Sequence, residues 1–389
     1  MTDLKAFALA FSLPALALAS CARADSGDSA AQADAEGAER PFTSEVMATF
    51  EEPWAIEFAP GTAMLFVTEQ GGSLKVMDTA TGAIGTVSGV PPVDYGGQGG
   101  LGDIAFLPGE ADGDLAGRTI YLSFAEAGEG DTRGAALGRG TLECGAVDAC
   151  AIEGFEVIWR QAPKVTGRGH YSHRIQVSPD GQHLFVASGD RQKQTPAQDL
   201  SNTLGTIVRL DLDGSPAAGN PFADREGVPD EIWSYGHRNI LGMDFDAQGR
   251  LWETEHGPKG GDELNIVERG ANYGWPERSD GINYDGSPIP DHAPDDGFTK
   301  PEVSWTPVIA PGDMIIHSGT MFDTWKGDAL ITGLSTEALI VVALEGDSAR
   351  EIARHDMDNR LRSIEEGPDG AVWVAEDGEE GRLLKLTPR

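Results

Sequence analysis

The sequence predicts an all-β protein built as a six-bladed β-propeller. Three observations lead to this prediction. Short strand-like runs recur along the chain, Pro, Asp and Gly turns separate them, and no long amphipathic helix pattern is present. With 389 residues, 40% of them hydrophobic, the chain can bury a large core. Its 51 glycines suit an architecture with many tight turns.

One unit recurs six times: an apolar strand, a Pro/Asp/Gly turn, and a second strand that ends in small or acidic residues. The units begin, in order, at Phe58, Phe106, Val177, Phe245, Met321 and Glu365. In several of them a further strand follows, as in SLKVMD, TIVRLDLDG and ALIVVALEG. Six units over residues 42–389 give roughly 58 residues each, which fits four-stranded blades. Five or seven blades would require a miscounted repeat.

Residues 1–20 are predicted to be a processing segment. Lys5 precedes an apolar run of about 14 residues, too short to span a bilayer comfortably. The run ends in LASC at residues 18–21, which is typical of a bacterial lipoprotein signal in which Cys21 becomes the lipidated first residue. The alternative is an ordinary signal peptide cleaved near Ala22 or Ala24. We expect a periplasmic or cell-surface protein whose membrane contact is a lipid anchor on Cys21.

Residues 21–41 are small and acidic, and we expect a flexible tether that leaves residues 42–389 as the catalytic propeller. The formal net charge is −34, from 63 acidic and 29 basic side chains. This balance argues against a nucleic-acid partner, whose binding needs a basic surface. Cys144 and Cys150 flank a turn between two strands. They are expected to form a disulfide in an oxidising compartment, with two free thiols as the alternative.

Residues 232–276 form the centre of the predicted site. Two strands, MDF and RLWETE, flank a DAQG turn and indicate a hairpin. The loop before it carries Arg238, whose fork of donors suits a carboxylate or a developing oxyanion. The loop after it offers the oxygen ligands that calcium prefers, carbonyls and carboxylates: those of Gly257, Pro258, Asp262 and Glu263. The alternative is a surface turn with salt bridges.

Other loops add candidate residues. Gln98 lies among glycines that would let the backbone approach a ligand closely. His170 precedes a strand and could take a proton from a hydroxyl group. Asp190, at the end of the next strand, could orient that imidazole and stabilise its cation.

Arg360 and Arg362 are two residues apart and therefore share one face of a predicted strand. Their positive charges repel each other unless an anion lies between them. A polycarboxylate ligand would provide that anion, and an acidic neighbour such as Glu365 is the alternative.

At these motifs the chain resembles a known family. GQGGLGDIAF, GHYSHRIQVSPDGQ, YGHRN and EHGPKGGDELNIVERGANYGWP occur in the same order in the soluble pyrroloquinoline quinone (PQQ)-dependent aldose dehydrogenases, the glucose/sorbosone dehydrogenase group. The resemblance runs from about Pro53 to Leu386. It implies a six-bladed propeller that uses PQQ and Ca²⁺ to oxidise aldoses at the anomeric hydroxyl to lactones. It also implies an electron acceptor, which the sequence does not identify.

The resemblance assigns roles to the candidate residues. His170 would be the general base, Asp190 would hold and polarise it, and Arg238 would stabilise negative charge on the quinone oxygen. Four side chains would contact PQQ: Gln98, Asn239, Arg360 and Arg362. The carbonyls of Gly257 and Pro258 would hold the Ca²⁺ that grips PQQ, whereas Asp262, Glu263 and the carbonyl of Tyr273 would form a second, structural calcium site.

The chain departs from the family pattern at one position. The family has a PQQ-binding Lys in the loop between two strands of the fifth blade, where this chain has Ser335, Thr336 and Glu337. Lys259 and Lys193 are candidates to replace it. The departure keeps two alternatives open: a carbohydrate-binding propeller that has lost PQQ and is no enzyme, and a calcium-dependent lactonase.

Overall fold

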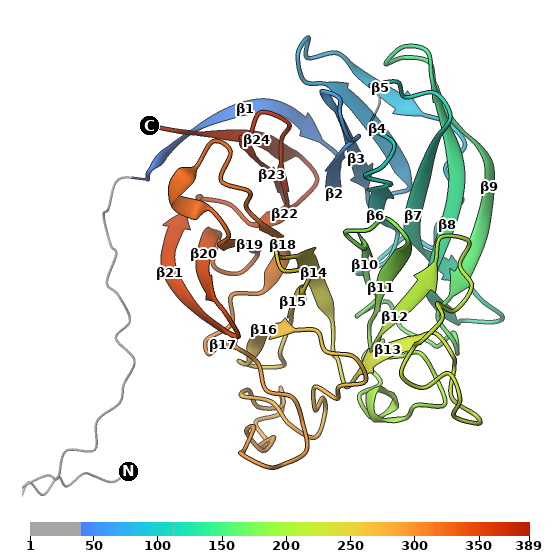
Figure 1. Cartoon of the computed structure of the whole chain (residues 1–389), viewed down its shortest axis with the longest axis vertical. Coiled ribbons are helices and arrows are strands. Elements are labelled where there is room, and N and C mark those ends of the chain that lie inside the picture. The colour runs from blue at the N-terminus through green and yellow to red at the C-terminus, as the bar shows by residue number, and fades with distance from the viewer. Residues whose placement is uncertain (1–39, 112) are drawn as a thin grey trace, which may run out of the picture. The chain divides into compact units, whose positions relative to one another are not determined.

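The computed structural model describes residues 40–111 and 113–389. Six four-stranded antiparallel sheets follow one another around a central axis (Figure 1). This arrangement confirms the predicted six-bladed β-propeller. The predicted signal peptide and nearly all of the predicted tether lie outside the described residues, so the lipid anchor on Cys21 and the periplasmic or cell-surface location stay predictions. No helix in the described part of the chain is long and apolar enough to cross a bilayer.

Each of the first three blades is a run of four consecutive strands. Blade 1 consists of β2 (Pro53–Phe58), β3 (Met64–Glu69), β4 (Ser73–Asp78) and β5 (Ile84–Val87). Blade 2 consists of β6 (Leu101–Phe106), β7 (Arg118–Ala127), β8 (Arg133–Cys144) and β9 (Cys150–Arg160). Blade 3 consists of β10 (Ser172–Val177), β11 (His183–Ser188), β12 (Thr206–Asp211) and β13 (Ile232–Tyr235).

The next two blades repeat this order. Blade 4 consists of β14 (Ile240–Phe245), β15 (Leu251–Glu255), β16 (Asp262–Ile266) and β17 (Val303–Trp305). Blade 5 consists of β18 (Pro311–Ile316), β19 (Ala329–Gly333), β20 (Ala338–Glu345) and β21 (Ser348–Asp356). Two short 3₁₀ helices, η1 (Thr195–Gln198) and η2 (Asp323–Trp325), are the only helices within the described ranges.

Blade 6 closes the ring with strands from both ends of the propeller. Its inner strands are β22 (Leu361–Glu366), β23 (Val372–Glu376) and β24 (Gly381–Pro388), and β1 (Phe42–Phe50) is its fourth strand. β1 pairs antiparallel with β24, from Phe42 opposite Pro388 to Phe50 opposite Gly381. Backbone hydrogen bonds therefore join the two ends of the propeller domain.

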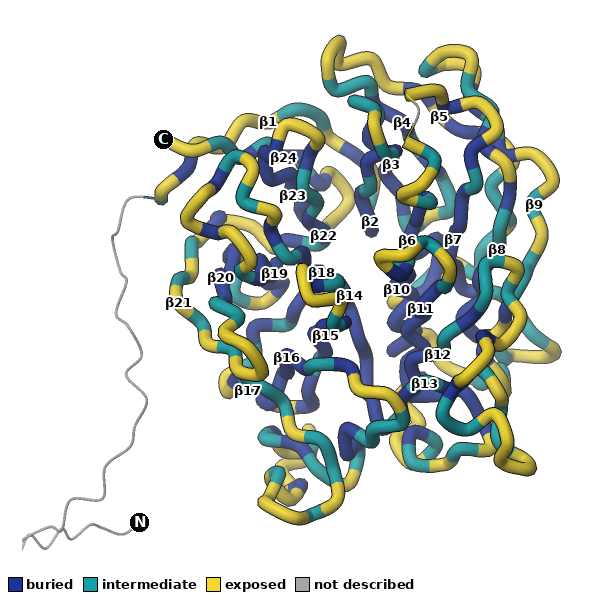
Figure 2. Tube along the Cα trace, viewed as in Figure 1, coloured by how far each residue is buried: buried dark blue, intermediate teal, exposed yellow. Residues whose placement is uncertain are grey.

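Hydrophobic clusters hold neighbouring blades together around the ring. Blades 1 and 2 meet at Phe66 and Phe106, whose ring centroids are 5.1 Å apart. Phe58 packs against Trp373 at 5.6 Å and joins blade 1 to blade 6. Figure 2 shows buried residues concentrated along inner strands such as β2, β10 and β11, while exposed and intermediate residues alternate along the outer strand β21. Burial of apolar surface between blades is the main stabilising contribution of this fold.

The central hairpin and the cysteine pair have the predicted structures. Asp246 accepts hydrogen bonds from the backbone N–H groups of Gln248 and Arg250 at 2.9 Å, and Gly249 adopts a φ of 77°, which favours glycine. β14 and β15 pair antiparallel across this turn. Cys144 and Cys150 form a disulfide that joins β8 to β9, so the alternative of two free thiols is wrong.

Candidate active site

A cavity of about 230 Å³ lies where the six blades converge. Every blade contributes to it, through inner strands and the loops next to them. Its lining includes Trp54, Gln98, Tyr171, His173, Asn239, His256, Leu334, Arg360 and Arg362. The cavity therefore brings together segments that are up to about 300 residues apart in sequence, as the propeller prediction requires.

His170 and Asp190 form a buried pair beside this cavity. Nδ1 of His170 is 2.6 Å from Oδ1 of Asp190, and the His170 side chain is 9% exposed. The second carboxylate oxygen accepts a hydrogen bond from Nε1 of Trp275 at 2.8 Å. The backbone N–H groups of Gln192 and Gln194 also donate to Asp190, at 2.7 and 3.1 Å. Asp190 is thus held from four directions and fixes the imidazole, as predicted.

The charges around this pair favour a neutral imidazole and an ionised carboxylate. Burial lowers the pKa of His170 from its usual value, the hydrogen bond to Asp190 offsets part of that effect, and the charge of Arg238 lowers the pKa further. Burial alone would raise the pKa of Asp190, but the bonds from His170, Trp275 and the backbone bring it below the usual range. With its Nδ1 proton donated to Asp190, His170 keeps the lone pair of Nε2 for a substrate proton.

Arg238 lies next to this pair, and its guanidinium is only partly satisfied. Nη1 donates to the carbonyl oxygen of His256 at 3.0 Å, and Nη2 lies 3.4 Å from the hydroxyl of Tyr284. The guanidinium carbon is 5.1 Å from the ring centre of Trp275. Nε is buried and makes no hydrogen bond to a described residue. A guanidinium with an unused donor is suited to an anionic oxygen.

Arg360 and Arg362 share a protein carboxylate. Asp377 accepts a hydrogen bond from Nε of Arg360 at 2.8 Å, and from Nε and Nη2 of Arg362 at 2.9 and 2.7 Å. The acidic neighbour left open by the sequence is therefore Asp377 rather than Glu365. Both arginines still line the cavity. Two guanidinium groups against one carboxylate leave one positive charge for an anionic ligand.

Gln98 and Asn239 hold the loop that carries His170. Oε1 of Gln98 accepts a hydrogen bond from the backbone N–H of His170 at 2.5 Å, and Oδ1 of Asn239 accepts one from Ser172 at 3.2 Å. Both side chains also line the cavity. His256, on the neighbouring wall, has a pKa lowered to about 3 by burial and by the charges of Arg238, His170 and Arg362. His256 lines the same cavity as Arg360 and Arg362.

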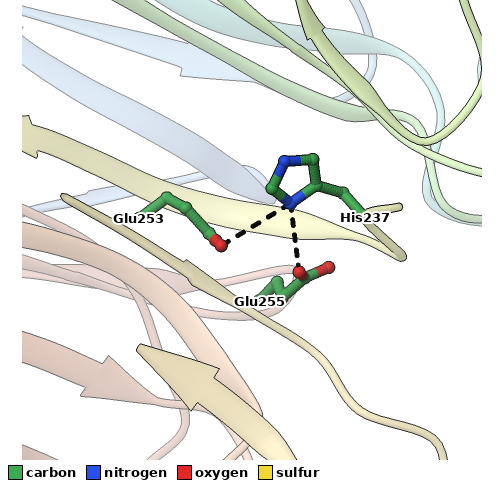
Figure 3. A group of neighbouring side chains, drawn as sticks. All are labelled: His237, Glu253 and Glu255. Carbon is green, nitrogen blue, oxygen red and sulfur yellow. Dashed lines mark hydrogen bonds and ion pairs between the residues drawn. The ribbon is translucent and has the colours of Figure 1, made fainter. Parts of the chain in front are cut away.

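Three glutamates are buried beneath this wall. Glu253, Glu255 and Glu263 are at most 7% exposed. In Figure 3, Nδ1 of His237 lies between two of them, 3.7 Å from Glu253 and 3.2 Å from Glu255. Oε2 of Glu253 and Oδ1 of Asn265 are buried without a hydrogen bond to a described residue. Burial raises the pKa of Glu253 and Glu263, and the charge of Glu255 raises both further.

This set of donors fits a hard divalent cation. A cavity of about 10 Å³, close to the space that one water-sized group needs, is bordered by Glu255, Glu263, Tyr273 and Gly257. Carboxylate and carbonyl oxygens are the ligands that calcium prefers, and a cation would satisfy oxygens that otherwise repel each other. The residues present therefore fit the calcium ion that the sequence predicts near Glu263 and Tyr273.

Asp262 does not join this group through its side chain. Adjacent residues of a strand point to opposite faces, so Asp262 and Glu263 diverge on β16. Asp262 instead accepts hydrogen bonds from the backbone N–H groups of Gly257 at 2.8 Å and Ala310 at 2.6 Å. The prediction that both carboxylates hold one ion therefore stays a prediction, and in the structure the Asp262 carboxylate is bonded to the backbone of the neighbouring loop. Asp262 fixes the loop of Gly257 and Pro258, both of which are buried.

The fifth-blade loop contributes no cation to the cavity. Its Leu334 lines the wall and accepts a hydrogen bond from Nη1 of Arg360 at 3.3 Å. Lys193 and Lys259 are exposed, and neither lines the cavity. The lysines proposed from sequence as replacements therefore do not take the place of the family Lys. Arg360 and Arg362 carry the positive charge of the lining within the described part of the chain.

Two residues of the site were not predicted from the sequence, Trp275 and Asp377. Trp275 holds Asp190, and Asp377 neutralises one of the two arginines. Trp275 could have been found, because it lies in the NYGWP motif. Asp377 carries no spacing signal, since it acts through a contact with a neighbouring strand. His256, which lies in the loop after the predicted hairpin, forms one wall of the cavity.

Comparisons with known proteins identify the family of the chain. The sequence model of the Glucose / Sorbosone dehydrogenase family matches residues 50–385. The aldose sugar dehydrogenase YliI of Escherichia coli (strain K12) is 36% identical over 344 residues, which cover 87% of this chain and 91% of the relative.

Solved structures of related enzymes have the same fold. The crystal structure of the soluble aldose sugar dehydrogenase from Escherichia coli, in the apo-form, has a TM-score of 0.83 at 36% identity, and the match covers 90% of this chain and all of that one. The PQQ-bound aldose sugar dehydrogenase of Streptomyces coelicolor has a TM-score of 0.72 at 27% identity, covering 90% and 98% of the two chains. With the match to nearly the whole propeller, these findings show that the chain belongs to the glucose/sorbosone dehydrogenase family and is a sugar dehydrogenase, an oxidoreductase.

Proposed function

We propose that this protein oxidises aldoses at the anomeric hydroxyl to lactones, with PQQ as the cofactor and Ca²⁺ as its metal. The observation that carries the proposal is a neutral imidazole, held by a buried carboxylate, beside a cavity that contains two guanidinium groups. The PQQ-bound state of the related Streptomyces coelicolor enzyme supports the choice of cofactor. Bound PQQ supplies the two-electron acceptor for the hydride that leaves the anomeric carbon.

His170 acts as the general base in this proposal. Its Nε2 takes the proton of the anomeric hydroxyl, while Nδ1 stays hydrogen-bonded to Asp190 at 2.6 Å. The ionised carboxylate of Asp190 stabilises the imidazolium that forms and keeps the ring from rotating. This arrangement resembles the use of a buried carboxylate behind a histidine base in other enzymes.

Positively charged groups serve the anionic cofactor. Arg238, whose Nε is unpartnered, would stabilise negative charge on the bound cofactor. Arg360 and Arg362 bind carboxylates of PQQ with the guanidinium donors that Asp377 leaves free. The carbonyls of Gly257 and Pro258 would hold the Ca²⁺ that serves the cofactor, and Asp262, Glu263 and the carbonyl of Tyr273 would hold a second, structural Ca²⁺. An external acceptor, which the sequence predicts without identifying, takes up the electrons.

The pH dependence of turnover tests the assignment of the base. Because the pKa of His170 is lowered from 6.5, its imidazole stays neutral at pH 7, and base function is lost only as the pH falls through the lowered pKa. We expect the acidic limb of kcat/KM to have its inflection below pH 6.5. PQQ binding measured over the same range separates loss of the base from loss of the cofactor. An inflection at pH 7 or above would contradict this assignment.

Calcium is expected to stabilise the protein through the buried glutamates. At a free calcium concentration 100-fold above the dissociation constant, the gain in free energy of unfolding is about 2.7 kcal/mol. Glu263→Gln should remove most of this gain. In chelator the variant should be at least as stable as wild type, because one repelling buried carboxylate is gone. Thermal unfolding with and without Ca²⁺ measures both effects, and an equal calcium response of the two proteins would rule out this site.

A reconstitution assay tests the proposed function and its alternatives. Purified protein is loaded with PQQ and Ca²⁺ and supplied with aldoses and a dye acceptor. We expect sugar-dependent dye reduction that needs PQQ. Sugar binding without any PQQ binding would instead favour the non-enzymatic carbohydrate-binding propeller. The absence of the family Lys is the reason for considering this alternative. Hydrolysis of lactones with Ca²⁺ alone would favour a lactonase.

A further inference from the structure

Aromatic rings form one side of the cavity wall, next to an ion-pair cluster. Tyr171 and His173 are stacked, with ring centroids 5.1 Å apart and an interplanar angle of 9°. Trp54 meets His173 edge-on at 5.7 Å. The guanidinium carbon of Arg174 lies 4.4 Å from the ring centre of Trp54. Arg174 also bonds to groups of three other blades, through Asp103 and the carbonyl oxygens of residues 241 and 312. His173 thus lies next to the cluster of ion pairs and hydrogen bonds that Arg174 forms between blades.

His173 is a polar side chain of this wall that the protein leaves without a partner. The residue is 2% exposed, and neither Nδ1 nor Nε2 makes a hydrogen bond to a described residue. Three other polar side chains of the cavity are satisfied, Gln98 by His170, Asn239 by Ser172 and Arg362 by Asp377, whereas the Tyr171 hydroxyl is also unpaired. Leaving a buried polar group unpaired costs about 1–3 kcal/mol. Such a cost in a ligand cavity indicates that a ligand group pairs with the imidazole.

The backbone at His173 is also strained. Its φ is 78°, and Ser172 before it has a φ of 64°, a region that residues with a side chain rarely adopt. Residues in such conformations cost about 1–3 kcal/mol each and cluster at ligand sites. Gly102 makes room for the ring, since a Cβ there would lie 2.8 Å from Cβ and Cγ of His173. Packing thus holds the imidazole in place against a local conformational preference.

We propose that His173 is a cofactor-contacting residue, whose imidazole forms a hydrogen bond with PQQ bound in the axial cavity. The inference rests on the proposed function and adds a contact that neither the catalytic pair nor the arginines provide. A neutral imidazole has one N–H donor and one acceptor nitrogen. Burial and the charges of Arg191 and Arg174 lower the pKa of His173 to about 3, so this contact is neutral throughout the working pH range. The hydrogen bond would fix the position of the cofactor without adding a charge to the site.

Variants of His173 and Tyr171 test this contact by PQQ titration followed by calorimetry in the presence of Ca²⁺. His173→Phe keeps a ring in the stack and removes both nitrogens. Its dissociation constant for PQQ should rise about 10-fold, which is about 1.4 kcal/mol. The melting temperature of the PQQ-free variant should rise by about 2 °C, because an unpaired buried group is gone. A purely structural histidine would not produce opposite changes in affinity and stability.

Tyr171→Phe is the matched control. Its hydroxyl is also buried and unpartnered, but the Cζ end of its ring packs against Gly99, where a Cβ would lie 3.0 Å away, and Gly99 does not line the cavity. We expect a comparable gain in stability and no change in PQQ affinity beyond about twofold. His173→Gln, which keeps a donor and an acceptor, should bind PQQ within about threefold of wild type.

The outcomes separate the two proposals. No PQQ binding by wild type would overturn the proposed function, and this contact with it. Wild-type binding together with unchanged affinity of His173→Phe would overturn the contact alone. Equal losses in His173→Phe and Tyr171→Phe would also overturn it, since the stack rather than the imidazole would then matter. If His173→Phe does not fold, His173→Leu carries the same expectation for affinity.

Discussion

Replacement of His170 by Gln is expected to lower kcat by about 10²–10⁴-fold, the usual contribution of a positioned general base. Gln has nearly the same reach as His but cannot take up a proton near neutral pH. The barrier should rise by about 3–5 kcal/mol, at 1.36 kcal/mol for each factor of ten. Steady-state assays of the PQQ-loaded protein with an aldose and a dye acceptor measure the change.

Two controls define this result. PQQ affinity of His170→Gln should stay close to that of wild type, because the base is expected to act on the substrate hydroxyl. His183→Gln, on β11, changes a histidine that lines neither the axial cavity nor the small cavity by the glutamates, and should leave kcat unchanged. A kcat for His170→Gln within tenfold of wild type, with PQQ bound, would show that another group removes the proton.

Replacement of Arg362 by Gln is expected to weaken PQQ binding by about 10–100-fold. Hydrogen bonds to charged groups contribute about 1.5–3 kcal/mol, which corresponds to this range of dissociation constants. The loss should be larger still because of Asp377, which accepts two hydrogen bonds from Arg362 in the wild-type protein. Without these bonds, Asp377 would present more of its negative charge to an anionic ligand. Calorimetric titration with PQQ and Ca²⁺ measures the affinity.

Arg360→Gln provides a graded comparison. Its side chain is 50% exposed, against 16% for Arg362, so solvent screens its charge more and the loss should be smaller. Arg350→Gln, on the outer strand β21 and 67% exposed, should bind PQQ as wild type does. If Arg362→Gln folds normally and binds PQQ with wild-type affinity, the arginine pair does not serve the cofactor.

The fold was predictable from the sequence because each blade repeats the same local pattern. The DAQG hairpin shows why: Asp246 and Gly249 determine the turn, and alternating apolar residues determine the faces of both strands. These signals are local and recur in every blade, so the number of blades follows from the number of turns. The closing pair of β1 with β24 carries no such signal, because its partners are more than 300 residues apart.

Residues of the site could be predicted only where a sequence motif contained them. His170, Asp190 and the two arginines of blade 6 were named from sequence, and in the structure the arginines line the axial cavity beside the His170–Asp190 pair. Asp377 was not found, because an acidic residue after a strand is common and only the pairing of β22 with β23 places it between the arginines. Asp262 and Glu263 were grouped as oxygen ligands of calcium, but the pleat of β16, which sends adjacent side chains to opposite faces, could not be read from the motif.

The central claim is that aldose and PQQ react in the cavity beside His170. The most direct test is an anaerobic titration of the PQQ- and calcium-loaded protein with aldose, in which the ultraviolet and visible spectrum of the bound quinone and the lactone are both measured. We expect one equivalent of aldose to convert all the bound quinone to its reduced form and to yield one equivalent of lactone. A fully loaded protein whose quinone spectrum stays unchanged in excess aldose would contradict it.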